Sequence, residues 1–260
     1  MTIGARIYGV AAIALGIPGL AYGRFAAMGQ PVPAEIRGHA MLAYATAALL
    51  IAAGLAINVR RSAVAGSLAL ASLFAVFLLW LHLPSAFTQP LVWVSWESLA
   101  ENFAMALGGL LAFTLAPGVG ERRVHVALIA RLLFGLCLAI FGTSEFVYAG
   151  FTASLVPAWL PPSPLFWTYL TGAAQFAAGM AVLSSVGARL AAILLTAMYL
   201  VFALIVHLPR VIANPGDAGI WGENGVNLVL AGAAWLLADS FAAARQRREQ
   251  AVADPQLPPS

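Results

Sequence analysis

Long apolar stretches alternate along the chain with short breaks rich in proline, glycine and polar residues. A helix needs about 20 mostly apolar residues to cross the hydrocarbon core of a bilayer. One break ends in Ser163-Pro164, a pair typical of a helix N-cap followed by a first-turn proline. Eight stretches reach the required length, at residues 4–22, 39–59, 63–83, 96–115, 127–148, 165–185, 189–208 and 222–241. The pattern predicts an all-α membrane protein with eight transmembrane helices.

Composition places the chain among integral membrane proteins. Of its residues 62% are hydrophobic and only 9% are charged, whereas ordinary soluble domains carry about 25% charged residues. A soluble protein of this length cannot bury so much apolar surface, so the excess must face lipid. The net charge is only +3 and the basic residues are scattered. We therefore expect the lipid bilayer, and not nucleic acid, as the partner.

One sequence motif occurs twice, 125 residues apart. His82-Leu83-Pro84 returns as His207-Leu208-Pro209, and Pro90, Trp96 and Asn102 return as Pro215, Trp221 and Asn227. Such an internal repeat predicts two four-helix units, at residues 1–116 and 127–241, joined by a cytoplasmic linker at 117–126. Because each unit has an even number of spans, both enter the membrane in the same direction. This parallel arrangement differs from the inverted repeats of many alternating-access carriers.

Arginine residues determine the expected orientation, because cytoplasmic loops carry an excess of positive charge. Three arginines, Arg24, Arg37 and Arg210, fall on one side of the expected spans, and the other ten fall on the opposite side. We therefore expect a multi-pass protein of the cell membrane with both termini in the cytoplasm. The polar tail at 242–260 is expected to be disordered.

Most polar residues of the expected spans fall in their non-cytoplasmic half. Ionisable side chains within a membrane are costly and usually persist for a reason. Glu97 and Glu101 are one helical turn apart and share a helix face, and Gln175 lies in the middle of its span. We take the following residues as a candidate polar cluster on the outer side: His82, His207, Glu97, Glu101, Asn102, Glu145, Gln175, Glu223 and Asn227.

Each repeated histidine ends the third apolar stretch of its unit, directly before a Leu-Pro pair. A histidine in a last helical turn interacts favourably with the helix dipole, and proline stops the helix, so a structural role is our preferred interpretation. Alternatively, the two rings hydrogen-bond a quinone, transfer a proton, hold a b-type haem, or bind a metal beside Glu97, Glu101 or Glu223. No compact ligand motif surrounds either ring. The sequence therefore disfavours haem, predicts no metal site, and leaves quinone as a candidate cofactor.

Motifs of the second half resemble a known membrane family. Arg131-Leu-Leu-Phe-Gly135, Gly142-Thr-Ser-Glu145-Phe146, Val156-Pro157-Ala-Trp159-Leu-Pro161, Gly172-Ala-Ala-Gln175, Arg189 and His207 are similar to the four-helix DoxX-like (DoxX/DoxD) family. The resemblance covers about 130–235 directly. It implies a four-helix membrane bundle in each unit and a link to membrane redox processes, where one relative is a subunit of a thiosulfate:quinone oxidoreductase. That family often has an acid at the position of Gln175.

These observations leave three hypotheses for function. The first is an accessory or quinone-linked subunit in membrane redox, working with other membrane redox subunits. The second is a permease or channel for a small solute, and the third is a membrane assembly factor without catalysis. The sequence has no glycine-rich phosphate loop, no H-E-x-x-H and no serine nucleophile elbow. It assigns no catalytic residue and does not decide whether the protein is an enzyme.

Overall fold

The computed structural model describes residues 2–26, 29–119 and 123–253, and within these ranges the chain is helical, without β-strands. Two of the long helices are interrupted by short π-helical turns, η1 and η2. The elements in chain order are α1 (Ile3–Tyr22), α2 (His39–Ile57), α3 (Ala63–Phe77), η1 (Leu78–His82), α4 (Leu83–Thr88), α5 (Trp93–Leu115), α6 (Arg123–Val147), α7 (Ala149–Leu155), α8 (Pro164–Ser184), α9 (Ala188–Phe202), η2 (Ala203–His207), α10 (Leu208–Ala213) and α11 (Ala218–Ala253).

The long helices have the character of membrane spans. In the described ranges, seven helical segments are long and apolar enough to cross a bilayer: α1, α2, Ala63–Thr88, α5, α6, Ala188–Ala213 and α11. The prediction of an all-α, multi-pass membrane protein agrees with this at the level of helix length and composition. Helix α8 coincides with the expected stretch 165–185 but is less apolar than the other seven. It begins as predicted, with the Ser163 hydroxyl accepting from the Phe166 backbone N–H at 3.3 Å.

Both His-Leu-Pro motifs lie inside helical segments, so the prediction that each proline stops its helix was wrong. A proline lacks the N–H of a normal α-helical turn, and its ring collides with the carbonyl four residues back. The chain widens into a π-helical turn before each proline, where Leu83 N–H donates to the Leu78 carbonyl and Leu208 N–H to the Ala203 carbonyl. The helix then continues as α4 or α10. The two interrupted segments have the same element boundaries, 125 residues apart.

The C-terminal region differs from the sequence expectation. Helix α11 continues to Ala253, so residues 242–253 are helical where we expected disorder. This segment is rich in alanine, arginine and glutamine, which are good helix formers, and Arg245 pairs with Glu249 one turn later at 2.7 Å. Residues 254–260 lie outside the described residues. The linker expected at 117–126 is also shorter, because α6 already begins at Arg123.

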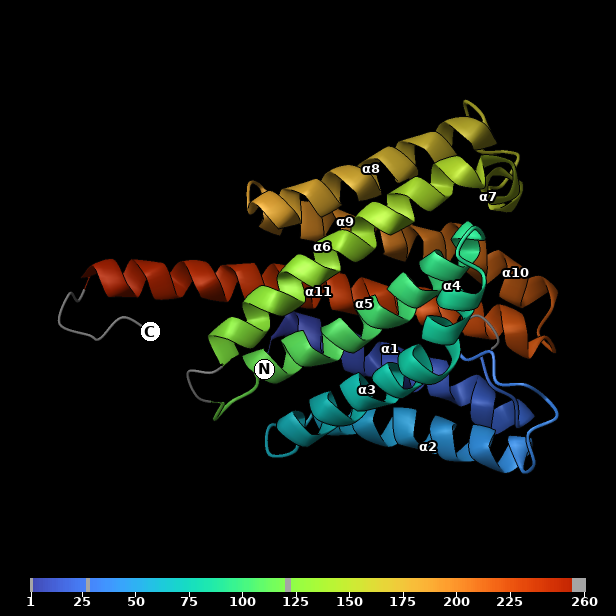
Figure 1. Ribbon diagram of the computed structural model, residues 1–260, viewed down its shortest axis with the longest axis horizontal. Helices are drawn as coiled ribbons and strands as arrows, with labels where there is room; N and C mark the ends of the chain where they lie inside the picture. Colours follow the sequence, from blue (N-terminus) through green and yellow to red (C-terminus); the bar gives the residue numbers. More distant parts are fainter. Residues whose placement is uncertain (1, 27–28, 120–122, 254–260) are drawn as a thin grey trace.

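The helices form two lobes that share a central pair of helices, α5 and α11. Helices α1, α2, α3 and α5 pack in chain order, as do α6, α8, α9 and α11. The first helix of each set packs against the last helix of the other, α1 on α11 and α6 on α5, and α5 also touches α11. In Figure 1, α11 runs through the middle, with α6 and α8 on one side and α1, α2 and α3 on the other. We call α1, α2 and α3 with the central pair the first lobe, and α6, α8 and α9 with the same pair the second lobe.

The cores of the two lobes differ in polarity. Leu50 of α2 and Phe74 of α3 are fully buried in the first lobe. The residues 125 positions later are Gln175 of α8 and Tyr199 of α9, and both are also buried. The second lobe therefore carries hydrogen-bonding groups at positions where the first lobe has hydrocarbon.

Candidate functional site

Three helices of the second lobe are joined by a chain of polar side chains. The Tyr199 hydroxyl of α9 donates to Gln175 Oε1 of α8 at 3.2 Å, and Gln175 Nε2 donates to Glu145 Oε1 of α6 at 3.3 Å. The backbone carbonyl of Tyr199 accepts from Asn227 Nδ2 of α11 at 2.8 Å. The other carboxyl oxygen of Glu145, Oε2, is buried and makes no hydrogen bond of good geometry among the described residues, although the Thr152 hydroxyl of α7 lies near the carboxyl.

Two glycines bring α6 and α8 close enough for this chain to form. A Cβ placed on Gly142 would lie 2.5 Å from the Phe176 nitrogen and 2.6 Å from the Gly172 carbonyl oxygen. A Cβ on Gly172 would lie 2.7 Å from the Glu145 Cβ. Because only hydrogen fits at these contacts, the two backbones touch and Glu145 reaches Gln175.

Helix α5 adds two carboxyl groups to the same region. Glu101 interacts electrostatically with Glu97 on its own helix and with Glu223 on α11, and Glu97 also acts on Glu145. The Trp93 indole N–H donates to the Ser144 hydroxyl at 2.7 Å, which fixes the start of α5 against the end of α6. Carboxyl groups from three helices, α5, α6 and α11, therefore lie within electrostatic range of one another, without direct contact. We call Glu97, Glu101, Glu145 and Glu223 the carboxyl cluster.

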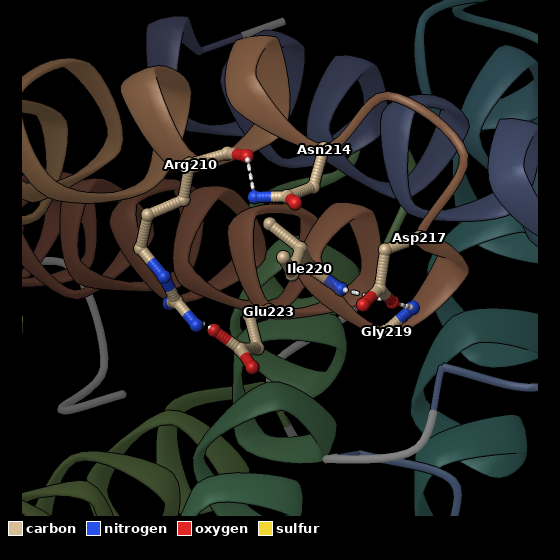
Figure 2. A network of polar contacts seen from close by, with 6 residues as sticks. All are labelled: Arg210, Asn214, Asp217, Gly219, Ile220 and Glu223. Carbon is tan, nitrogen blue, oxygen red and sulfur yellow. Dashed lines mark hydrogen bonds and ion pairs between the residues drawn. The ribbon is translucent and has the colours of Figure 1, made fainter.

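At Glu223, the carboxyl cluster has its own cation. The Arg210 guanidinium of α10 pairs with Glu223, and both side chains are partly exposed (Figure 2). Asp217 caps the start of α11, accepting from the backbone N–H of Gly219 at 2.8 Å. Figure 2 shows that Asp217 points away from the Arg210–Glu223 pair, so it belongs to the turn and not to the cluster.

His207 lies beside this ion pair. The ring interacts electrostatically with Glu223 and Arg210, and its Nδ1 atom is buried without a hydrogen-bond partner among the described residues. The Asn224 Oδ1 atom is also buried without a hydrogen-bond partner among the described residues. Unpaired buried polar atoms are uncommon in proteins and call for an occupant such as water, an ion or a ligand. Among the described residues the second lobe has three of them, on Glu145, His207 and Asn224, and the first lobe has two, Gln30 Nε2 and Asn102 Oδ1.

His82 occupies a different environment in the first lobe. The ring is buried, and its Nε2 lies 3.1 Å from the Gly29 carbonyl oxygen and 2.8 Å from Asn102 Nδ2. The ring tautomer decides which of these two contacts is a hydrogen bond. The protein itself therefore supplies hydrogen-bonding neighbours for Nε2.

The nine predicted residues therefore form two groups. His82 and Asn102 form a pair in the first lobe. The other seven lie in the second lobe, four of them on the helices that both lobes share: Glu97, Glu101, Glu223 and Asn227. Within the described part of the chain, no three His, Cys, Asp or Glu side chains are arranged to hold a metal ion.

Tyr199 and Arg210 belong to the site, although the sequence interpretation did not select them. Tyr199 lies in a strongly apolar helix, where a tyrosine is easily taken for a core aromatic residue. The signal that identifies it is the comparison of the two halves, because Phe74 stands 125 residues earlier and lacks the hydroxyl. The sequence predicts Arg210 only as a charge outside the span, since it predicts that the helix stops at Pro209, whereas the helix continues as α10.

Comparisons with known proteins give a single partial result. Residues 134–223 match the sequence model of a domain of unknown function, DUF8561. The matched segment includes Glu145, Gln175, Tyr199, Arg210 and Glu223, most of the second-lobe site. The searches for similar curated proteins and for similar solved structures found no match.

Proposed function

We propose that the protein is a quinone-linked accessory subunit of a membrane redox system, in which the second lobe binds a quinol and accepts its protons. The Glu145 carboxyl carries the proposal. Gln175 holds Oε1, whereas Oε2 is buried and unpaired among the described residues. A carboxylate oxygen in this position accepts a hydrogen bond from a ring hydroxyl of the quinol and is a suitable acceptor for its proton.

The rest of the carboxyl cluster provides places for protons to go. Like charges in surroundings of low dielectric repel one another strongly, so a group of carboxyls is stabilised by sharing protons or by binding a cation. A quinol releases two protons and two electrons when it is oxidised. The carboxyl cluster accepts the two protons. The two electrons pass to a carrier on another membrane redox subunit, so the proposed role of this protein is accessory. The resemblance of residues 130–235 to the DoxX-like family also supports a role in membrane redox.

The proposed architecture has eight spans in two parallel repeats. Helix α8 is counted as a span in addition to the seven more apolar helical segments. Helix α8 has 21 residues, enough for about 30 Å of helix, and it packs between α6 and α9. The matching boundaries of the two π-interrupted segments support the repeat. The arginine distribution supports a cell-membrane protein with cytoplasmic termini. In that orientation the carboxyl cluster lies in the outer half of the bilayer, and a quinol reaches it from that half.

Titration of the purified protein in nanodiscs with a short-chain quinol tests this function. Trp93 contacts Ser144, the neighbour of Glu145, so quinol bound at Glu145 should quench its fluorescence. We expect saturable quenching, with a Kd that is about tenfold weaker in Glu145→Gln, because the variant loses a charged hydrogen-bond acceptor worth about 1.5–3 kcal/mol.

The matched control is Glu249→Gln, an exposed glutamate on α11 paired with Arg245. This variant should bind quinol like the unaltered protein. Quenching that does not saturate, or that is equal in Glu145→Gln and Glu249→Gln, would overturn the proposed function.

A proton-coupled permease for a small cation is the second candidate. It is favoured by the continuity of the polar groups, which extend from Arg210 and Glu223 at the helix ends to Gln175 and Tyr199 in mid-helix. Proteoliposomes that enclose a pH-sensitive dye separate the two functions. A permease acidifies the lumen when an acid-outside gradient is imposed together with its cation substrate, whereas the quinol-linked subunit leaves the lumen unchanged.

A further inference from the structure

A buried arginine lies at the opposite end of the second lobe from the carboxyl cluster. Arg131 of α6 is only 9% exposed, and its guanidinium carbon lies 4.9 Å from the centre of the Phe241 ring of α11. Its Nε donates to the Ala127 carbonyl of the same helix at 3.2 Å. Arg6, the equivalent residue 125 positions earlier, is exposed. Helix α11 continues past Phe241 and covers Arg131, whereas α5, the equivalent of α11 in the first half, ends at Leu115.

More positive charge gathers around Arg131. Arg247 and Arg248 of α11 act electrostatically on Arg131, and Arg123 at the start of α6 acts on Arg247. Arg247 is itself partly buried. We call Arg123, Arg131, Arg247 and Arg248 the arginine cluster. Four like charges in one region repel one another, so the cluster is stabilised by an anion that binds between them.

The acidic groups described at this end of the bundle are engaged elsewhere. Glu249 pairs with Arg245 on the exposed side of α11. Asp239 accepts from the Gly4 backbone N–H of α1 at 2.9 Å. Among the described residues, no carboxylate forms an ion pair with a member of the arginine cluster.

The surface beside Arg131 is apolar and exposed. Leu128, Leu132 and Leu136 follow one another at four-residue spacing along α6, and each is between 39% and 51% exposed. Residues at this spacing form a continuous stripe along a helix. A ligand that fits both features has an anionic head for the guanidinium groups and a hydrocarbon chain for the leucine stripe.

We propose that the arginine cluster binds the phosphate of an anionic phospholipid, whose acyl chain lies along the leucine stripe of α6. Guanidinium groups bind phosphate oxygens in pairs of parallel hydrogen bonds. Basic sites between helix ends at the cytoplasmic face suit lipid headgroups. The bilayer also keeps the lipid next to the site at a high local concentration, which a soluble phosphate compound lacks.

Native mass spectrometry of protein released from mixed nanodiscs tests the site. The nanodiscs contain phosphatidylglycerol and phosphatidylcholine in equal amounts, and bound lipids are counted for each variant. We expect phosphatidylglycerol to be retained in preference to phosphatidylcholine. Arg131→Gln should lose about fivefold in this preference, the effect of one arginine near a headgroup. The exposed Arg6→Gln is the matched control and should retain the preference.

A second variant guards against misfolding of Arg131→Gln. Arg247→Gln/Arg248→Gln leaves the buried arginine in place and should lower the preference by about tenfold or more. Equal retention of the two lipids, or the same loss in Arg6→Gln as in Arg131→Gln, would overturn the proposal. Displacement of phosphatidylglycerol by millimolar inorganic phosphate would overturn it too, because the site would then recognise free phosphate and not lipid.

Discussion

At the scale of single residues, the two repeated histidines have different roles in our account. The His82 ring is buried against the Gly29 carbonyl and Asn102, so its removal leaves a cavity and unpaired polar atoms in the first lobe. The His207 ring borders the Arg210–Glu223 pair and has an unpaired nitrogen. The same sequence motif thus serves packing in one lobe and lines the proposed ligand site in the other.

This difference predicts opposite results for two alanine variants. His82→Ala should lower the free energy of unfolding by about 2 kcal/mol and leave the quinol Kd unchanged. His207→Ala should weaken quinol binding with a smaller loss of stability. Chemical unfolding in detergent and the fluorescence titration measure the two quantities. If both variants changed binding by the same factor, the histidines would act as a pair, and the division between the lobes would be wrong.

At the scale of elements, the sequence predicted the helices well and their interruptions poorly. Apolar length alone located all the long helices, because crossing a membrane requires a long uninterrupted apolar run. Proline is ordinarily a helix breaker, and nothing local to Pro84 or Pro209 indicates that a π-helical turn will absorb it. The helical end of α11 was missed because a polar composition was taken for disorder, although alanine and arginine are good helix formers.

The contact between α6 and α8 gives a prediction at the same scale. In Gly142→Ala the new methyl group would meet backbone atoms of α8 that cannot rotate away. The helices must separate, so we expect a loss of about 2 kcal/mol in stability and weaker quinol binding, since Glu145 moves away from Gln175. Thermal unfolding and the quinol titration measure the two effects.

Gly150→Ala in α7 is the control for this prediction, because a Cβ at Gly150 has no neighbour within 4 Å. Stability unchanged in both glycine variants would show that α6 and α8 are not in backbone contact.

At the scale of the whole molecule, the orientation of the bundle in the membrane decides which side of the bilayer the carboxyl cluster faces. Arginine counting predicts that the turn between α2 and α3 is cytoplasmic and that the turn before α8 is external. Cys137 is the single cysteine of the chain. In a Cys137→Ala background, Ser62→Cys should resist a membrane-impermeant maleimide in intact cells, and Ser163→Cys should react. The reverse pattern would put the carboxyl cluster on the cytoplasmic side and contradict the proposed orientation.

The site depends on the arrangement of the whole molecule more than on any motif. The sequence nominated seven of its residues from their depth in the expected spans. Three of them lie on α6, α8 and η2, and four lie on the shared helices α5 and α11. The sequence grouped Glu101 of α5 with Glu223 of α11 from their depth alone, but it could not predict the packing of α5 against α11, which brings these residues of the two halves near each other. Likewise, only the packing of α9 against α8 identifies Tyr199 as a partner of Gln175.

The most direct test of the central claim replaces two polar core residues of the second lobe by the apolar residues at the equivalent positions of the first lobe. The double variant Gln175→Leu/Tyr199→Phe introduces the residues that stand 125 positions earlier, where Leu50 and Phe74 pack fully buried. It removes the hydrogen bonds that hold Glu145 while keeping similar side-chain volumes. We predict that the variant folds and that its quinol Kd, measured in nanodiscs, rises by about tenfold or more, the effect of losing about 1.4 kcal/mol of binding energy. A folded variant with unchanged quinol binding would contradict the claim that the second lobe is the functional site.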